Sequence, residues 1–137
     1  MGQVARHEGA SLVLKQVKLL SRNLPVIVTG DFNAVPTDDP IKVLTDEKDP
    51  RHLTHARTLA PLCYGPEWTF HDYGRVPLDE RVWIDYIFVK GASMLGDSRD
   101  ILLKTDASGH LILLLYLKSR HIILSAATHC ILLQEMT

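Results

Sequence analysis

The strongest indication of the fold is the stretch Pro25-Val26-Ile27-Val28-Thr29-Gly30-Asp31-Phe32-Asn33-Ala34. Its first six residues are rich in β-branched side chains and too few for a helix, so they predict a strand buried on both faces, as inside an α/β sheet. Upstream, apolar residues recur mostly every three or four positions, which predicts an amphipathic helix that ends before Asn23 and buries one stripe: Val4, Ala5, Ala10, Leu12, Val13, Val17 and Leu20. A helix followed directly by a buried strand is half of a layered α/β unit, so we expect an α/β fold.

The loop after this strand carries the first polar residues that could do chemistry. Asp31 and Asn33 are two positions apart, so both side chains can project the same way from extended backbone. Such a pair can hold an attacking water, because the carboxylate accepts its proton and the amide fixes its orientation. Loops at the carboxyl ends of strands are also where open α/β sheets bind ligands. The alternative interpretation is a structural turn, which Asp and Asn form in many loops.

Further along the chain, Asp38, Asp39 and Pro40 suit the start of a short helix. Residues 68–73 have strand composition up to Gly74, and residues 81–89 are the second strong strand. Asp85 lies in the middle of that apolar run, where a carboxylate is destabilising unless it is paired or hydrogen-bonded. It could orient a histidine, with His71 and His110 as the candidates, or it could bond to backbone.

Three other sets of residues have both a functional and a structural interpretation. His52, His55 and Cys63 could hold zinc, but a fourth ligand is missing and solvated loop histidines are the favoured interpretation. His129 and Cys130 could form a nucleophilic pair, but packing is favoured, and we interpret both cysteines as reduced core thiols. The aromatic residues are interpreted as sheet core rather than as a base-stacking surface: Trp68, Phe70, Trp83, Tyr86 and Phe88.

The 137 residues carry 15 lysines and arginines against 16 aspartates and glutamates, a net charge of −1. These totals fit one ordinary domain and show no basic excess that would grip a nucleic acid backbone. The first residues have no apolar signal segment, so the default location is cytoplasmic. Residues 111–133 are apolar but are interrupted by charged residues, so we expect no membrane span. From residue 101 onward the pattern fits neither helical nor strand spacing.

Four segments resemble the endonuclease/exonuclease/phosphatase superfamily in order and approximate spacing: residues 4–12, 26–34, 68–71 and 81–89. The resemblance covers residues 2–92 of a single partial domain over 1–137, and residues 93–137 form an atypical tail. It implies a partial four-layer α/β sandwich of the deoxyribonuclease-like type. It also implies a metal-dependent phosphoesterase that uses Mg²⁺ or Mn²⁺ on a phosphodiester or phosphomonoester substrate.

The same resemblance implies a role for each candidate residue. Asp31 would position or deprotonate the attacking water, and would meet the metal through water or at a second metal position. Asn33 would help to hold the water and a phosphate oxygen, and Asp85 would orient the catalytic histidine. His110, in Ser108-Gly109-His110, stands about where the family has Ser-Asp-His-x-Pro, so it is predicted to be that histidine, and His71 is predicted to bind substrate.

Two departures from the family pattern leave a second function open. Family domains are longer, and their first half carries the Glu that is the principal metal ligand. We expect this chain to lack that half-site, and Glu8 is not assigned to it. A frameshift near residues 100–109 would explain the altered closing motif and the tail. The alternative to an impaired phosphoesterase is therefore an inactive remnant, or a half-domain that acts only by association through an exposed sheet face.

Overall fold

The computed structural model describes residues 2–22, 24–60, 62–91, 101–105, 111–117 and 120–126. Helices and strands are mixed along the chain, which confirms an α/β composition. Their order is α1 (Gln3–Ser21), β1 (Val26–Asp31), α2 (Asp39–Thr45), β2 (Thr54–His55), α3 (Ala56–Leu59), β3 (Leu62–Tyr64), η1 (Asp72–Gly74), η2 (Leu78–Glu80), β4 (Asp85–Lys90), β5 (Ile101–Thr105), β6 (Leu111–Leu117) and β7 (Arg120–Ala126).

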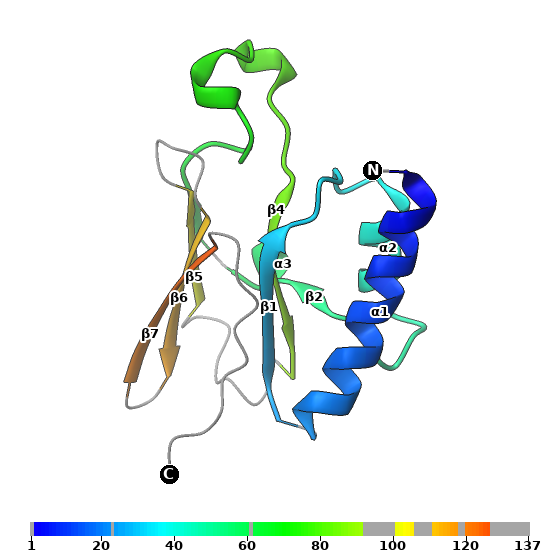
Figure 1. Ribbon diagram of the computed structural model, residues 1–137. Coiled ribbons are helices and arrows are strands. Elements are labelled where there is room, and N and C mark those ends of the chain that lie inside the picture. The colour runs from blue at the N-terminus through cyan, green and yellow to red at the C-terminus, as the bar shows by residue number, and fades with distance from the viewer. Residues whose placement is uncertain are drawn as a thin grey trace.

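The strands form two sheets. The first has the order β1-β4-β2, with β4 in the middle and both pairings antiparallel. The second has the order β3-β5-β6-β7. Figure 1 shows α1 and α2 on one side of β1, and the strands β5, β6 and β7 on its other side. The pair β1–β4 therefore lies between the helices and the second sheet.

Strand β1 is buried as predicted, and β4 matches it. In each strand four consecutive residues are buried. Side chains alternate along a strand, so Tyr86 and Phe88 share one face, where their rings stack at 5.3 Å and Phe32 packs edge-on against both. Asp85 and Ile87 project from the opposite face. The β1–β4 pair forms the centre of the hydrophobic core.

Helix α1 confirms the predicted helix but corrects its buried stripe. The buried residues are Ala10, Leu14, Val17 and Ser21. This spacing of four, three and four residues follows one face of an α-helix. Four residues assigned to the stripe are instead exposed: Ala5, Val4 at 77%, Leu12 at 55% and Leu20 at 56%. Apolar residues occur all around this helix, so the spacing of apolar residues predicted a wider buried face than the helix has.

The strand predicted over residues 68–73 is wrong. The segment contributes one isolated bridge, Phe70 to Val82, and then turns, with left-handed backbone at Asp72, Tyr73 and Gly74. The strand predicted from residue 81 begins only at Asp85. Asp85 is thus the first residue of β4 and not its middle. The interpretation of the aromatic residues as sheet core is confirmed for Tyr86 and Phe88, which are buried in β4. Phe70 is 43% exposed and is not part of the core.

The C-terminal segment contains strands that the sequence pattern did not indicate. β5, β6 and β7 form antiparallel neighbours in the second sheet. β6 has the continuous apolar sequence of residues 111–117, and such a run has no two-residue alternation by which to recognise it. No helix in the described ranges is long and apolar enough to cross a membrane.

Candidate functional site

The pairing of β1 with β4 brings two predicted site residues together. Asp31 and Asp85 are direct partners in the antiparallel register. Directly opposite residues place their side chains on the same face, with Cβ atoms about 4.5–5.5 Å apart. The Asp31 side chain is exposed and Asp85 is half-buried. Two carboxylates thus share one face at the end of the sheet where β1 ends and β4 begins.

Asn33 follows in a tight turn built by Asp31. Its backbone N–H donates to Oδ1 of Asp31 at 2.8 Å, and its own φ is +47°. Asn is one of the few residues that adopt this left-handed conformation readily. The turn-forming interpretation is therefore confirmed, and it is compatible with a chemical role. Asp31 is exposed at this tip, so its carboxylate is accessible to solvent.

The start of β4 is fixed by a residue that the sequence analysis missed. The buried hydroxyl oxygen of Thr69 accepts hydrogen bonds from the N–H groups of Ile84 at 3.0 Å and Asp85 at 2.9 Å. The carbonyl of Ile84 in turn accepts the N–H of Phe32 at 2.9 Å. Thr69 therefore holds the backbone on which the Asp85 carboxylate is mounted. No spacing rule would have singled out this threonine.

Tyr86 is the second missed supporting residue. Its hydroxyl donates to the carbonyl of Ala34 at 2.8 Å and lies 3.3 Å from the carbonyl of Trp83. Burial, together with the nearby carboxylates of Asp38 and Asp85, raises the pKa of this phenol far above its ordinary value. The hydroxyl thus stays protonated and keeps its donor. The loop from residue 31 to 34 is anchored to β4 by this bond.

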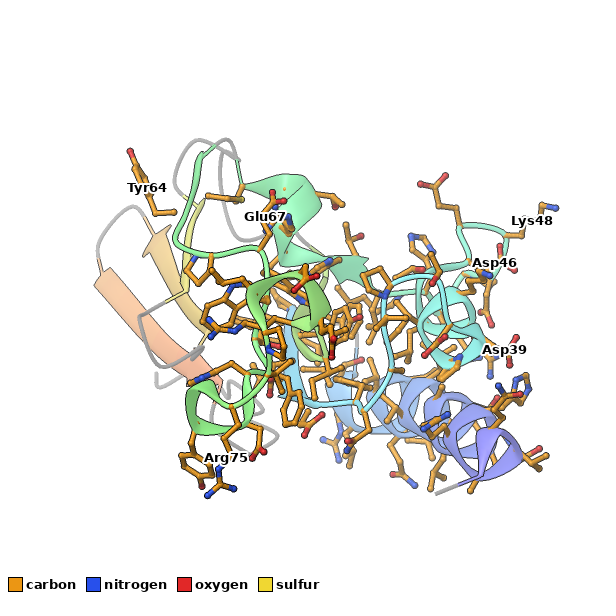
Figure 2. The ribbon with its side chains drawn as sticks, turned by 90° about the horizontal axis from the view of Figure 1, so that it is seen from above. Asp39, Asp46, Lys48, Tyr64, Glu67 and Arg75 are labelled. Atoms are coloured by element: carbon orange, nitrogen blue, oxygen red, sulfur yellow. The ribbon has the colours of Figure 1, made fainter. Side chains whose placement is uncertain are left out.

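His71 lies at the base of a loop formed by residues 71–81. Its ring contacts Trp68 at 5.0 Å between centroids, and its carbonyl accepts the N–H groups of Gly74 and Val76. Figure 1 shows this loop projecting beyond the sheet at the end where β1 finishes. Figure 2 shows Arg75 at its outer edge. The position of the loop agrees with a substrate-facing role for His71, which stays a prediction.

The zinc interpretation of His52, His55 and Cys63 is wrong. Nδ1 of His52 bonds to the Asp49 carbonyl at 2.8 Å, while Cys63 is exposed and contacts the Arg57 carbonyl through Sγ at 3.9 Å. Across the residues that the structure describes, no three metal-binding side chains come together. Exposed Cys63 also corrects the prediction of a core thiol. His110 and the His129-Cys130 pair lie outside the described residues.

His55 is packed among aromatic rings and is not a solvated loop residue. Its ring lies 5.1 Å from Tyr86, 5.7 Å from Phe88 and 5.9 Å from Trp83. Its Nε2 is buried without a hydrogen-bond partner among the described residues. Burial, followed by the positive charge of Arg57, lowers the pKa of His55 to about 4. The imidazole is therefore neutral at pH 7 and acts as part of the core.

The carboxylate pair supplies some, but not all, of the oxygen ligands that a hard cation requires. Mg²⁺ prefers oxygen ligands, and is commonly held by one or two carboxylates with water and substrate phosphate completing the octahedron. Asp31 and Asp85 match that donor chemistry and lie on one face. The described residues add no third metal-binding side chain to them. A cation here would need ligands from water, substrate or residues beyond this set.

The family of the chain is established by its sequence match. The model of the Endonuclease/Exonuclease/phosphatase family matches residues 4–121. The chain belongs to this family. The predicted resemblance is confirmed, and the match includes Asp31, Asn33 and Asp85 as well as the positions of His71 and His110. This is a phosphoesterase family, whose members typically use a divalent metal.

Solved structures of the endonuclease/exonuclease/phosphatase family agree with this assignment. Family proteins from Bacteroides vulgatus and Bacteroides thetaiotaomicron are each 30% identical over 76% of this chain, with TM-scores of 0.62 and 0.57. A functionally unknown conserved protein from Enterococcus faecalis V583, 24% identical over 95% of the chain with a TM-score of 0.61, supports the fold alone. The chain spans 36%, 34% and 46% of those three chains. No curated protein matches it.

Proposed function

We propose that the chain carries the water-positioning part of a metal-dependent phosphoester hydrolysis site. The observation that supports this most is the cross-strand pairing of Asp31 with Asp85, next to the Asn33 turn. Asp31 accepts the proton of the attacking water, and Asn33 orients that water and a phosphate oxygen. Both groups sit at the exposed end of a rigid strand pair, where a phosphoester can approach.

Asp85 orients a histidine in this proposal. A carboxylate that bonds to an imidazole fixes its tautomer and stabilises its protonated form. His110 is the proposed partner, and the protonated ring would then contact the scissile phosphate. His71, at the base of the projecting loop, is proposed to bind substrate.

The cofactor in this proposal is Mg²⁺ or Mn²⁺, with Asp31 contributing through water or at a second metal position. Such a cation supplies stabilisation of the charge that develops on the phosphoryl oxygens. The remaining ligands come from outside the described residues or from substrate, in keeping with the two-carboxylate donor set. The chain is proposed to form a partial four-layer α/β sandwich of the deoxyribonuclease-like type.

The test is hydrolysis of an aryl phosphodiester, bis(p-nitrophenyl) phosphate, as Mg²⁺ is raised. Loss of a positioned general base typically lowers a rate by about 10²–10⁴-fold, so Asp31→Ala should reduce metal-dependent turnover by that factor. Glu47→Ala is the control, because Glu47 is an exposed carboxylate on another loop. Equal turnover by Asp31→Ala and the control would reject the proposal.

The short span of the chain favours a second candidate, a half-domain that works only in association. It covers roughly a third to a half of each matched structure. Under this proposal, turnover per molecule rises with protein concentration, together with the mass measured by sedimentation. Constant specific activity from a monomer would exclude it. If no turnover is measured at any metal or protein concentration, both of these functions are excluded and the chain is an inactive remnant.

A further inference from the structure

A groove lies at the opposite end of the β1–β4 pair from Asp31. It is bounded by the C-terminal half of α1 and the loop of residues 46–51, and it has a volume of about 820 Å³. An adjoining hollow of about 350 Å³ shares Lys18, Pro50 and Arg51 with it, and reaches Lys90 at the end of β4. A six-residue strand spans about 17 Å between its ends. The groove is therefore separate from the carboxylate pair.

The groove is strongly positive although the chain is nearly neutral. Two acidic side chains line it, Asp46 and Asp49. Five basic side chains line it and its adjoining hollow: Lys15, Lys18, Lys48, Arg51 and Lys90. Five positive and two negative groups leave a formal charge of +3 on a chain whose total is −1. Positive charge is thus concentrated at this end.

The two acidic side chains are already engaged with the loop itself. Asp49 binds Arg51 through both carboxylate oxygens, with Nη2 to Oδ2 at 2.6 Å and Nε to Oδ1 at 2.9 Å. These bonds lower the pKa of Asp49 to about 2. Asp46 accepts the backbone N–H of Lys48 at 3.1 Å. Within the described ranges, no carboxylate forms an ion pair with any of three groove lysines: Lys15, Lys18 and Lys48.

The cations are mounted on ordered backbone. Lys15 and Lys18 are three positions apart on α1 and so share one side of the helix. Nζ of Lys90 donates to the carbonyl of Pro50 at 2.8 Å, which ties the loop to the end of β4. Figure 2 shows Lys48 extending outward from the same loop, beside Asp46. The positive groove therefore exists before any ligand arrives.

We propose that this groove binds a small ligand with two or more phosphate groups. Ammonium groups are compact point charges that bind phosphate well, and three of them are available here. The volume falls within the range of about 300–1,000 Å³ that small-molecule sites occupy. Leu19, which is 69% exposed, and Pro50 add apolar surface for the scaffold that carries the phosphates. The groove's ligand could be a free polyphosphorylated molecule or a lipid headgroup with the same chemistry.

Titration calorimetry of the full chain with inorganic tripolyphosphate tests the site. The Lys15→Ala/Lys18→Ala/Lys48→Ala variant should bind at least about tenfold more weakly, since each exposed ion pair contributes modestly. Lys42→Ala is the matched control, because Lys42 is an exposed lysine on α2 that does not line the groove, and it should bind within twofold of the parent. Circular dichroism confirms that all variants are folded. Unchanged affinity in the triple variant would overturn the proposal.

Two further binding measurements identify the chemical class of the ligand. Vesicles of phosphatidylcholine with 5% of a bisphosphorylated inositol lipid are compared with vesicles of equal charge made with phosphatidylserine. Preferential binding to the inositol lipid indicates a headgroup, and binding of tripolyphosphate alone indicates a soluble ligand; both support the proposal. Poly-glutamate of matched charge that binds as tightly as tripolyphosphate would overturn the phosphate assignment. Asp31→Ala should leave the affinity unchanged, so this test is independent of the hydrolysis test.

Discussion

The hydroxyl of Tyr86 and the carbonyl of Ala34 are hydrogen-bonded at 2.8 Å, although the two residues are 52 positions apart in the chain. The bond crosses from β4 to the loop that contains Asp31 and Asn33. It is buried, so neither group can turn to water instead. The position of the candidate site loop thus depends on the interior of the fold.

Tyr86→Phe should reduce the free energy of unfolding by about 1–2 kcal/mol, because it leaves a buried carbonyl without its donor. Urea denaturation followed by circular dichroism measures the change. Tyr73→Phe is the control, since Tyr73 is 93% exposed and should change stability by less than about 0.5 kcal/mol. Equal stability of the two variants would show that the Tyr86 bond has no energetic importance.

Thr69→Val should destabilise the chain by about 2–3 kcal/mol. The valine methyl cannot accept the N–H groups of Ile84 and Asp85, and two backbone donors then lose their partner. Thr69→Ser retains the hydroxyl and should recover most of the loss in the same denaturation experiment. Because valine keeps the methyl group and loses only the hydroxyl, a Thr69→Val variant as stable as the parent would show that the two hydrogen bonds have no energetic importance.

Stability should fall as the pH drops from about 6.5 towards 4, because of His55. Its pKa is lowered from 6.5 to about 4 in the folded chain, so in this range the unfolded chain binds more protons. The stabilisation is complete above pH 6.5 and is lost as the pH falls through the folded value. His55→Phe should flatten this part of the profile of thermal midpoint against pH. His52→Gln, the control, should retain the parental slope.

Asp31→Asn should separate metal binding from folding. The amide keeps the Oδ1 acceptor for the Asn33 N–H, and it removes one of two like charges from opposite positions in the strand pair. Without divalent ions the variant should therefore be as stable as the parent, or slightly more so. Addition of Mg²⁺ should raise the thermal midpoint of the parent but not of Asp31→Asn. If Mg²⁺ raised the thermal midpoint of both proteins by a similar amount, Asp31 would not be a ligand of the cation.

Substitutions at Asn33 distinguish its backbone role from its chemical role. Asn33→Gly accepts the left-handed φ of +47° without strain, so the fold should be retained while phosphodiester turnover falls. Asn33→Ala should lose turnover and also about 1 kcal/mol of stability, because alanine lacks the short polar side chain that lets asparagine adopt this left-handed conformation. Full activity in Asn33→Gly would show that the amide serves the turn alone.

The predictable parts of the fold were those with local patterns. The β-branched run at residues 26–29 and the helical spacing of α1 are visible in short windows, and both elements form as predicted. The segment over residues 68–73 failed because strand composition is overridden there by a left-handed turn at Asp72 and Tyr73. In β6 the apolar run has no alternation, so composition alone could not identify a strand.

The sequence predicted which residues belong to the candidate site, but it did not predict which of them face one another across the β1–β4 pair. Asp31, Asn33 and Asp85 are recognisable from their motifs, whereas the direct pairing of Asp31 with Asp85 depends on how two distant strands align. Thr69 and Tyr86 could not be found in advance, because their importance comes from a single hydroxyl reaching backbone far away in the chain. Supporting residues of this kind have no local signature.

Within the described part of the chain, the backbone hydrogen bonds of the projecting loop of residues 71–81 run inside the loop, and those that secure it to the sheet lie at its base. Thr69 and Phe70 both donate to the carbonyl of Val82, and the Thr69 hydroxyl secures the start of β4. The bonds inside the loop, such as Gly74 N–H to the His71 carbonyl, are self-contained. Loops with such separate anchoring tolerate exchange and insertion. This architecture is modular: a different loop could be grafted between the same anchors, and selectivity could diverge while the underlying scaffold is inherited unchanged.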